Sequence, residues 1–504
     1  MKNLKRLFAI ALTVVMVLAM TTTAFAAETV NNATEHAYDV YQIFAGTQAA
    51  DDTEGKLAVT GWGSGINGEA FLAALKASNK FGTPNIFADA TTAVEVAEVL
   101  TGATAEQARA FGNLATGYLT QVKAAEDVTN GTVTLDAGYY LVVDNTAVNG
   151  ENDAKNVSLL QVTKMGDFEI QKKYDVPTVQ KKVKDINDTT DTQPSNWQDS
   201  ADHDIGDVVE FQLTGTLPTN YADYDTYFYQ FNDTMSEGLT YNNDAKVYVV
   251  NGTDRTEVTT QFDLTGAIAT IACANLKAIT GATITKDSKI VVEYTATLNE
   301  KAIIGAAGNP NTVNLEFSNN PNAGGEGDKG KTPDDTVIVF TYKVTVNKVD
   351  PQNQPLKGAE FKLYKKLQDS TEVEIATATV VDENTTSFDF TGLDDGDYIL
   401  RETKVPAGYN GIADIKFTVT AEHDIESASP ALTALSGNVT TGEVTFTAST
   451  AEGSLSTTVV NKSGSVLPET GGIGTTLFYV FGAILVIGAG VLLVAKKRMS
   501  SSEN

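Results

Sequence analysis

Apolar and polar residues alternate in short runs along most of this chain, which predicts strands more often than helices. Between residues 176 and 340 the runs are separated by Gly, Asn and Asp. This pattern is typical of an antiparallel β-sandwich. The predicted strands here span 208–213, 226–231, 246–250, 289–298 and 312–317. A second all-β stretch, 337–460, opens with a strand over 342–349 and closes with one over 455–460.

The first part of the chain has a mixed pattern. Helical spacing predicts helices over 69–76, 93–100 and 105–120, and two strand-like runs lie within 133–144 around a turn at 136–138. Residues 27–174 are therefore expected to form an α+β domain. The expected fold class is mainly β, with tandem immunoglobulin-like β-sandwiches following this domain.

Both ends of the chain carry apolar segments. Three cations precede the apolar run 7–20, and residues 24–26 (Ala-Phe-Ala) form a small-x-small cleavage site, which predicts a secretory signal peptide over 1–26. Residues 471–495 carry no charge and are followed by Lys496, Lys497 and Arg498. This order predicts one transmembrane helix with its basic end in the cytoplasm.

The length and charge of the mature chain exclude several classes. Residues 27–470 number 444, enough for roughly three domains of about 150 residues. The predicted boundaries are 27–174, 175–335 and 336–465, before a sorting segment over 467–504. Without the processed ends the charge is 30 − 63 = −33, which argues against nucleic acid and anionic membranes as partners. The single cysteine, Cys273, allows no internal disulfide and is expected to be buried.

We find no sequence pattern for a metal, a cofactor or a hydrolytic triad. His36, His203 and His423 are far apart and are expected to be exposed. The acidic segment 185–191 lacks the glycine and glutamate of a calcium loop and is expected to be a solvated turn.

Three polar residues share strand faces with apolar ones. Lys348 lies on the face of Tyr342, Val344 and Val346. By the same alternation Glu402 lies with Tyr398 and Leu400, and Asn461 lies with Val459. All three are therefore expected to point into one core.

Burial would give these groups unusual chemistry. Desolvation lowers the pKa of a lysine and raises that of a glutamate. A neutral Lys348 could attack the amide of Asn461 while Glu402 moves protons, which would form an isopeptide bond and release ammonia. The alternatives are a buried salt bridge or a lysine that extends to solvent.

Longer motifs in this region resemble a known family. Residues 348–350 (KVD), 356–361 (LKGAEF) and 398–409 (YILRETKVPAGY) are similar to a CnaB-type domain of Gram-positive pilins, and the last is similar to the pilin E box with valine at position 405. The resemblance covers about 120 residues. It implies that Lys348, Asn461 and Glu402 are the lysine, asparagine and acid of a self-formed isopeptide bond.

The preceding region resembles the central isopeptide domain (CnaA-like) of backbone pilins. The similar strings are 177–181 (PTVQK), 231–239 (FNDTMSEGL) and 311–321 (NTVNLEFSNNP). The resemblance implies a bond between Lys181 and Asn311 with Asp233 as its acid. Each of the two bonds is expected to join the first strand of its domain to the last.

The C-terminal segment resembles a cell-wall sorting signal. Leu467, Pro468, Glu469, Thr470 and Gly471 precede the apolar segment and the cations, as in Gram-positive surface proteins. In that family a sortase cuts between the residues that match Thr470 and Gly471 and passes the threonine acyl group to an amine. Pilins supply this amine from a lysine near the end of the first domain. By position Lys172, or else Lys173, is the expected acceptor, although both could be ordinary exposed lysines.

The resemblance implies a sortase-assembled major (backbone) pilin, a structural protein anchored in the cell wall. The expected partners are pilus-specific and housekeeping sortases, other copies of the chain, peptidoglycan, and tip and basal pilins. Only the precursor's C-terminal helix is expected to meet the membrane. The alternative is a monomeric wall-anchored adhesin or ancillary pilin, and an exported hydrolase is disfavoured.

Overall fold

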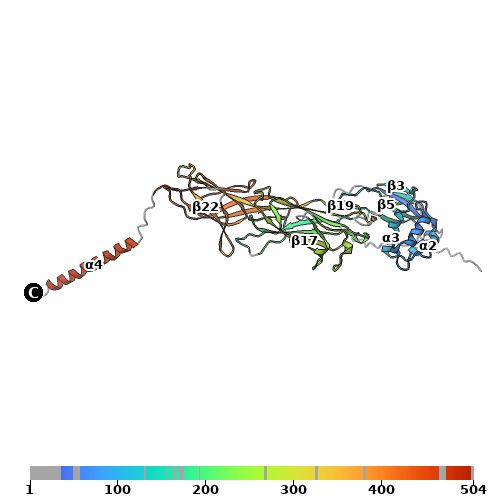
Figure 1. Cartoon of the computed structure of the whole chain (residues 1–504), viewed down its shortest axis with the longest axis horizontal. Coiled ribbons are helices and arrows are strands. Elements are labelled where there is room, and N and C mark those ends of the chain that lie inside the picture. The colour runs from blue at the N-terminus through green and yellow to red at the C-terminus, as the bar shows by residue number, and fades with distance from the viewer. Residues whose placement is uncertain are drawn as a thin grey trace, which may run out of the picture.

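The structure is a computed structural model. It describes residues 36–48, 57–129, 132–155, 157–162, 166–169, 175–191, 193–265, 270–323, 327–377, 382–464 and 473–500. Three domains follow one another along the long axis (Figure 1). The fold is mainly β, as predicted, with two sandwiches after an α+β domain. The predicted signal peptide lies outside the described residues.

In the N-terminal domain a five-stranded sheet separates three helices from a two-stranded ribbon. Apolar residues of β1 and β5 alternate between its faces: Tyr139 and Leu141 pack with the helices, whereas Tyr140 and Val142 pack with the ribbon. The sheet holds β2 (Leu57–Trp62), β1 (Tyr38–Gln48), β5 (Gly138–Asp144) and β6 (Val157–Val162), with β3 (Ala125–Val128) on β1; the ribbon pairs β4 (Thr132–Leu135) with β7 (Gly166–Glu169).

The three predicted helices of this domain begin within one residue of their predicted starts, and a short 3-10 helix, η1, was not predicted. They are α1 (Gly68–Ala77), η1 (Asn79–Phe81), α2 (Ala93–Leu100) and α3 (Ala105–Thr116). Capping boxes start α2 at Thr92 and α3 at Thr104. The prediction that α3 continues to residue 120 was wrong, because the backbone after Thr116 bonds to residues 65–67 instead.

The middle domain is a sandwich of two sheets. One has the order β14 (Asp254–Glu257), β13 (Lys246–Asn251), β17 (Lys289–Leu298), β10 (Val208–Gly215), β8 (Val179–Val183), with β12 (Leu239–Tyr241) on β17. The other has the order β15 (Asp263–Thr265), β16 (Thr270–Cys273), β11 (Tyr229–Met235), β18 (Asn309–Ser318), β20 (Asp335–Phe340), β9 (Ser200–Asp202), with β19 (Lys329–Lys331) on β18. Short helices η2 (Tyr221–Asp223), η3 (Thr259–Gln261) and η4 (Leu276–Ala278) join the strands. Cys273 is buried in this core, as predicted.

The C-terminal domain is a smaller sandwich. Its first sheet has the order β24 (Ser387–Leu393), β21 (Tyr342–Val349), β29 (Ser454–Val460), β28 (Thr447–Ser449), and β21 runs parallel to β29. Its second sheet has the order β23 (Glu372–Thr377), β22 (Glu360–Lys366), β25 (Gly396–Lys404), β26 (Ile415–His423), β27 (Leu432–Thr441). The predicted boundary at residue 335 falls at the start of β20, whose pairing with β18 places residues 335–340 in the middle sandwich.

The segment 319–335 docks the N-terminal domain onto the middle one. Its strand β19 pairs with β18. The backbone of Gly150 donates a hydrogen bond to the carbonyl of Lys329 over 2.6 Å, and Lys331 donates to Glu151 over 3.1 Å. The buried Asn319 side chain donates to the carbonyls of Val148 and Asp153. The two domains therefore share a hydrogen-bonded junction.

A buried histidine ties the start of β1 to this junction. Both ring nitrogens of His36 contact carboxylates, Nδ1 with Asp144 at 2.5 Å and Nε2 with Asp153 at 2.7 Å. Burial opposes the charged imidazolium, but the two carboxylates prevail and raise the pKa of His36 from 6.5 to about 9. The prediction that His36 is exposed was therefore wrong.

Beyond the sandwiches lies α4 (Ile473–Ser500), the helix predicted to cross the membrane. Its segment Phe478–Lys497 has a mean hydropathy of 2.5 and no buried residues. Twenty residues of this composition are long enough to span a bilayer.

The His36 contacts predict how the stability of the N-terminal domain depends on pH. Because the pKa of His36 is raised on folding, its contribution is complete below pH 6.5 and is lost as the pH rises towards 9. Thermal unfolding at pH 6 and pH 9 should show this loss, and it should be absent from His36→Gln. An equal pH dependence in the variant would contradict it.

Candidate isopeptide sites

The middle sandwich brings Lys181, Asp233 and Asn311 together in its core. Lys181 Nζ lies 2.6 Å from Asp233 Oδ1. Lys181 comes from β8 in one sheet, whereas Asp233 on β11 and Asn311 on β18 come from adjacent strands of the other sheet. A bond between Lys181 and Asn311 would therefore cross the sandwich. The expectation that it joins the first and last strands was wrong, because β19 and β20 follow β18.

A tyrosine hydroxyl links these three groups. Tyr294 OH lies 3.0 Å from Lys181 Nζ, donates to Asp233 Oδ2 over 2.7 Å and accepts from Asn311 Nδ2 over 2.8 Å. Sequence reasoning assigned no role to Tyr294, which lies on β17. The sequence feature that could have identified it is the position of a tyrosine on an inward strand face in a domain with a predicted buried lysine.

Burial prepares the lysine of this site for reaction. Lys181 and Asn311 are 0% exposed. Burial lowers the pKa of Lys181 although Asp233 opposes the shift. The Oδ1 atom of Asn311 has no hydrogen-bond partner among the described residues. The site therefore contains an amine with reduced affinity for its proton and an amide oxygen that can accept a proton or a hydrogen bond.

The C-terminal sandwich brings Lys348, Glu402 and Asn461 together. In the parallel pairing of β21 with β29, Lys348 is opposite Val459, and Asn461 lies two residues beyond. Glu402 comes from β25 in the facing sheet and accepts a hydrogen bond from Asn461 Nδ2 over 2.8 Å at Oε1. Its Oε2 accepts the backbone N–H of Ile412 over 3.2 Å. Glu402 therefore orients the amide of Asn461.

Lys348 has no carboxylate within ion-pair distance among the described residues. Its Nζ donates only to the backbone carbonyls of Val349 and Val459, over 3.1 and 3.2 Å. The side chain is 0% exposed, as predicted, and burial lowers its pKa while Glu402 opposes the shift. Asn461 is also buried, and its Oδ1 lacks a partner in the described chain. This arrangement favours the neutral amine that an acyl transfer requires.

Glu293 of β17 lies outside the middle-domain core. It forms an ion pair with Arg255 and accepts a hydrogen bond from Gln212 over 2.8 Å. Glu293 therefore does not belong to the lysine site.

The junction between the two sandwiches buries charges that the sequence suggested would be exposed. His203 is 3% exposed, and its Nε2 contacts the carbonyl of Lys184 at 3.0 Å. The His423 side chain is 8% exposed and lies 3.5 Å from Asp185 and 3.6 Å from Asp202. The predictions of exposed histidines were therefore wrong. The predicted turn is present at 188–190, within a segment whose residues 185–189 are half-buried and whose residues 190 and 191 are exposed.

This junction includes a serine beside a histidine, but it is not a hydrolytic site. Ser200 Oγ lies 2.8 Å from His423 Nδ1 and donates to the carbonyl of Asp424 over 2.6 Å. Burial opposes protonation of His423, but Asp185 and Asp202 raise its pKa to about 10. A protonated imidazole cannot act as a base, and Ser200 is fully buried.

Two groups at the junction could offer ligand atoms to a metal ion: Asp185, Asp202 and His423, and Asp188, Asp204, Asp207 and Asp394. In the second group Lys365 Nζ already contacts three of the carboxylates. The prediction that the chain binds no metal stays a prediction.

The remaining predicted sites cannot be placed. The sorting motif Leu467–Gly471 and the candidate acceptors Lys172 and Lys173 lie outside the described residues.

Three family models match separate parts of the chain. A Gram-positive pilin backbone subunit 2, Cna-B-like domain matches residues 205–321, a SpaA prealbumin-like fold domain matches 342–430, and an LPXTG cell wall anchor motif matches 459–501. The first description differs from the CnaA-like type expected for the middle domain.

The chain is also similar to streptococcal surface proteins. The trypsin-resistant surface T6 protein of Streptococcus pyogenes serotype M6 is 27% identical over 390 residues, covering 65% of this chain and 70% of that protein. The solved T6 backbone pilin of the same organism shares the fold, with a TM-score of 0.51 and 19% identity over 86% of this chain and 96% of that one. The pilus 2b backbone protein of group B streptococcus gives a TM-score of 0.38 and 20% identity, covering 57% of this chain and 99% of that one. Pilin domain models match both sandwiches and an anchor model matches the segment behind them, and together with the T6 relative these findings support a sortase-assembled backbone pilin of Gram-positive type.

Proposed function

We propose that the chain is a pilus shaft subunit that forms two internal isopeptide bonds and is joined covalently to its neighbours. In this proposal sortase cleaves between Thr470 and Gly471, and the acyl group of Thr470 passes to Lys172 of the next subunit. The observation that carries the proposal is that each sandwich brings a buried lysine and a buried asparagine together with an acid.

The internal bonds would form by acyl transfer within the folded chain. The neutral lysine Nζ attacks Cγ of the asparagine, the C–N bond to Nδ2 breaks, and ammonia leaves. In the C-terminal site Glu402 carries the proton from the lysine to Nδ2. In the middle site Asp233 accepts the lysine proton, and Tyr294 OH, which contacts both Asp233 and Asn311 Nδ2, passes a proton to the leaving nitrogen.

The two bonds lie close to the predicted attachment points. Lys181 follows Lys172 by 181 − 172 = 9 residues, and Asn461 precedes Thr470 by 470 − 461 = 9 residues. Force would enter at Lys172, cross from Lys181 to Asn311, pass along residues 311–348, and cross again from Lys348 to Asn461. Most of both sandwiches would therefore carry no tension, and the N-terminal domain would lie outside the load path.

Monomeric display is the alternative function. A wall-anchored adhesin would also carry an LPXTG motif and could use the same internal bonds. What separates the two is an acceptor lysine, which a shaft subunit needs and an adhesin does not.

The first prediction concerns polymerisation. Wall extracts boiled in SDS should show a ladder of covalent multimers that is lost in Lys172→Ala, because the acyl group then has no amine acceptor. Lys182→Ala is the control. A ladder that survives substitution of both Lys172 and Lys173 would exclude this acceptor, and absence of any ladder in the wild type would favour the adhesin.

The second prediction concerns extension under force applied between residues 172 and 470. With both bonds in place only the segment 311–348 can unfold under tension, 37 residues or about 130 Å. Lys181→Ala should add the 311 − 181 = 130 residues that the bond would shield, about 450 Å of contour length.

Lys182→Ala is the matched control for this measurement. Lys182 forms an ion pair with Asp199 and takes no part in the middle-domain core. A wild-type chain that extends as far as Lys181→Ala would exclude the bond in the middle domain.

The third prediction concerns the role of the Tyr294 hydroxyl in proton transfer. Tyr294→Phe should slow formation of the Lys181–Asn311 bond by about 100-fold, the typical contribution of a proton-transfer group, without affecting the C-terminal bond. Mass spectrometry at intervals after refolding measures the rate. Tyr241→Phe is the control, because this ring packs against Tyr294 but its hydroxyl contacts the backbone of Ala245. Equal rates in Tyr294→Phe and the wild type would exclude the relay.

A further inference from the structure

A third lysine is buried as completely as the two described above. Among the lysines whose side chains the structure describes, only Lys181, Lys348 and Lys365 are 0% exposed. Lys365 is an inward-facing residue near the end of β22, where the C-terminal sandwich meets the middle one. Sequence reasoning assigned it no role.

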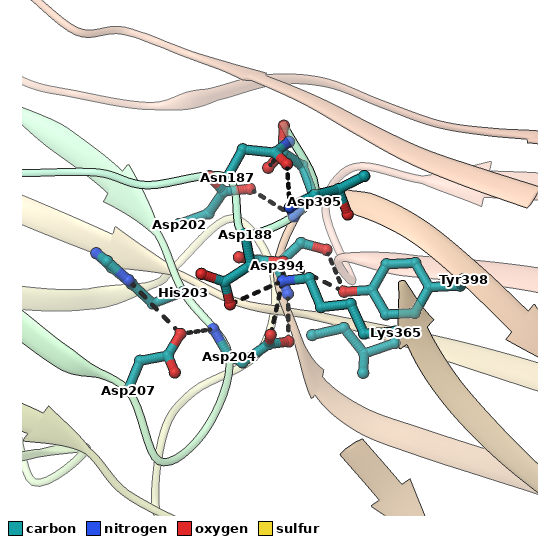
Figure 2. A network of polar contacts seen from close by, with 12 residues as sticks. Asn187, Asp188, Asp202, His203, Asp204, Asp207, Lys365, Asp394, Asp395 and Tyr398 are labelled. Atoms are coloured by element: carbon teal, nitrogen blue, oxygen red, sulfur yellow. Dashed lines mark hydrogen bonds and ion pairs between the residues drawn. The ribbon is translucent and has the colours of Figure 1, made fainter. Parts of the chain in front are cut away.

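Acids from both domains surround its amine (Figure 2). Lys365 Nζ lies 2.7 Å from Oδ2 of Asp204, a residue of the middle domain, and in direct contact with Oδ1 of Asp394 in its own domain. Asp188 of the middle domain lies farther away, at 3.5 Å. The lysine therefore touches one buried acid from each side of the junction.

The arrangement shares three features with the middle-domain site, and the first of them also with the C-terminal site. Asp394 Oδ2 is a buried oxygen without a hydrogen-bond partner among the described residues, as are Oδ1 of Asn311 and Oδ1 of Asn461. A tyrosine hydroxyl, Tyr398 OH, lies 3.2 Å from Asp394 Oδ1, and the lysine amine lies 5.9 Å from the centre of the Tyr398 ring. The corresponding distance from Lys181 to the Tyr294 ring is 5.5 Å.

Asp204 is held where an acid catalyst is needed. Its Oδ1 accepts the backbone N–H of Asp394 over 3.0 Å while its Oδ2 contacts Lys365. The carboxyl group of Asp204 thus spans the amine and the residue that the amine would attack. It reaches this position only because residues 202–205 dock against the turn 391–397, as the bond from Ile205 N to the carbonyl of Gly392 shows.

We propose that Lys365 and Asp394 form a third isopeptide bond, with Asp204 of the neighbouring domain as its acid. The Lys365 nitrogen attacks Cγ of Asp394, a C–O bond breaks, and water leaves. Asp204 takes the proton from the nitrogen and returns it to the departing oxygen. An ammonium and a carboxylate thus become an amide and one water molecule, and no further reactant is needed.

The charges at this site predict a slow reaction. Burial lowers the pKa of Lys365, whereas the carboxylates of Asp394 and Asp204 raise it. The effect of the carboxylates is larger, so before the reaction Lys365 forms an ion pair with these acids. Burial also raises the pKa of Asp394 well above its ordinary value and raises the pKa of Asp204, which favours transfer of the lysine proton to Asp204. At Lys181 and Lys348 burial already lowers the lysine pKa, so those bonds should form first.

Peptide mapping of the full mature chain by mass spectrometry tests the proposal. The wild type should yield a peptide pair joined through Lys365 and Asp394, lighter than the sum of its parts by about 18 Da because water leaves in the acyl transfer. Lys365→Arg, which keeps the charge, should lack it. Asp204→Asn should form it about 100-fold more slowly although neither joined residue has changed.

Asp207→Asn is the matched control, since Asp207 belongs to the same acidic group but forms no ion pair with Lys365 among the described residues. The Lys348–Asn461 peptide pair, mapped in the same digest, reports whether each variant has folded and whether the chemistry proposed for the other sites occurs. An unmodified Lys365 in a chain that carries the Lys348–Asn461 bond would overturn the inference. So would a bond from Lys365 to Asp204, or a bond that forms equally fast in Asp204→Asn.

Discussion

The rest of this structure depends on the burial of lysine amines inside β-sandwiches. An ammonium removed from water without a partner costs several kcal/mol. A sandwich that buries a lysine must therefore deprotonate it, pair it with an acid or convert it into a covalent bond. Here Lys181 is paired with Asp233, Lys365 lies between two acids, and Lys348 touches only carbonyl oxygens. Each arrangement requires groups from separate strands to converge on one atom, which fixes how the sheets face each other.

The order of the domains determines how the proposed bonds would transmit force along the polymer. In the proposed polymer the two lysine–asparagine bonds would bypass most of each sandwich, leaving residues 311–348 as the part of the load path held only by non-covalent contacts. That segment includes β20, which pairs with β18. The acidic junction around Lys365 and His423 adds contacts between the two sandwiches beside this segment. The junction would therefore resist bending of one sandwich relative to the other as well as extension.

Alternation along single strands was enough to predict much of this architecture. It placed Lys181 and Lys348 on inward faces because a strand has a period of two: Lys181 has apolar neighbours at i ± 2, and Lys348 follows apolar residues at i − 2 and i − 4. It could not identify Tyr294, whose importance lies in a hydroxyl that meets groups on three other strands. It also failed at the domain junctions. Lys365 and Asp204 are 161 residues apart, and Ser200 and His423 are 223 apart, so no local pattern shows that they meet. For the same reason His36 was predicted to be exposed, since its carboxylate partners lie more than 100 residues away.

The central claim is that the two buried lysine–asparagine sets are covalent bonds. Mass spectrometry of the intact mature chain tests it most directly. The account predicts a mass about 34 Da below that of the unmodified chain, one ammonia for each acyl transfer, or about 52 Da when water is also lost at Lys365. Each of the single variants Asn311→Ala and Asn461→Ala should lose one ammonia fewer. A wild-type mass equal to that of the unmodified chain would contradict the account.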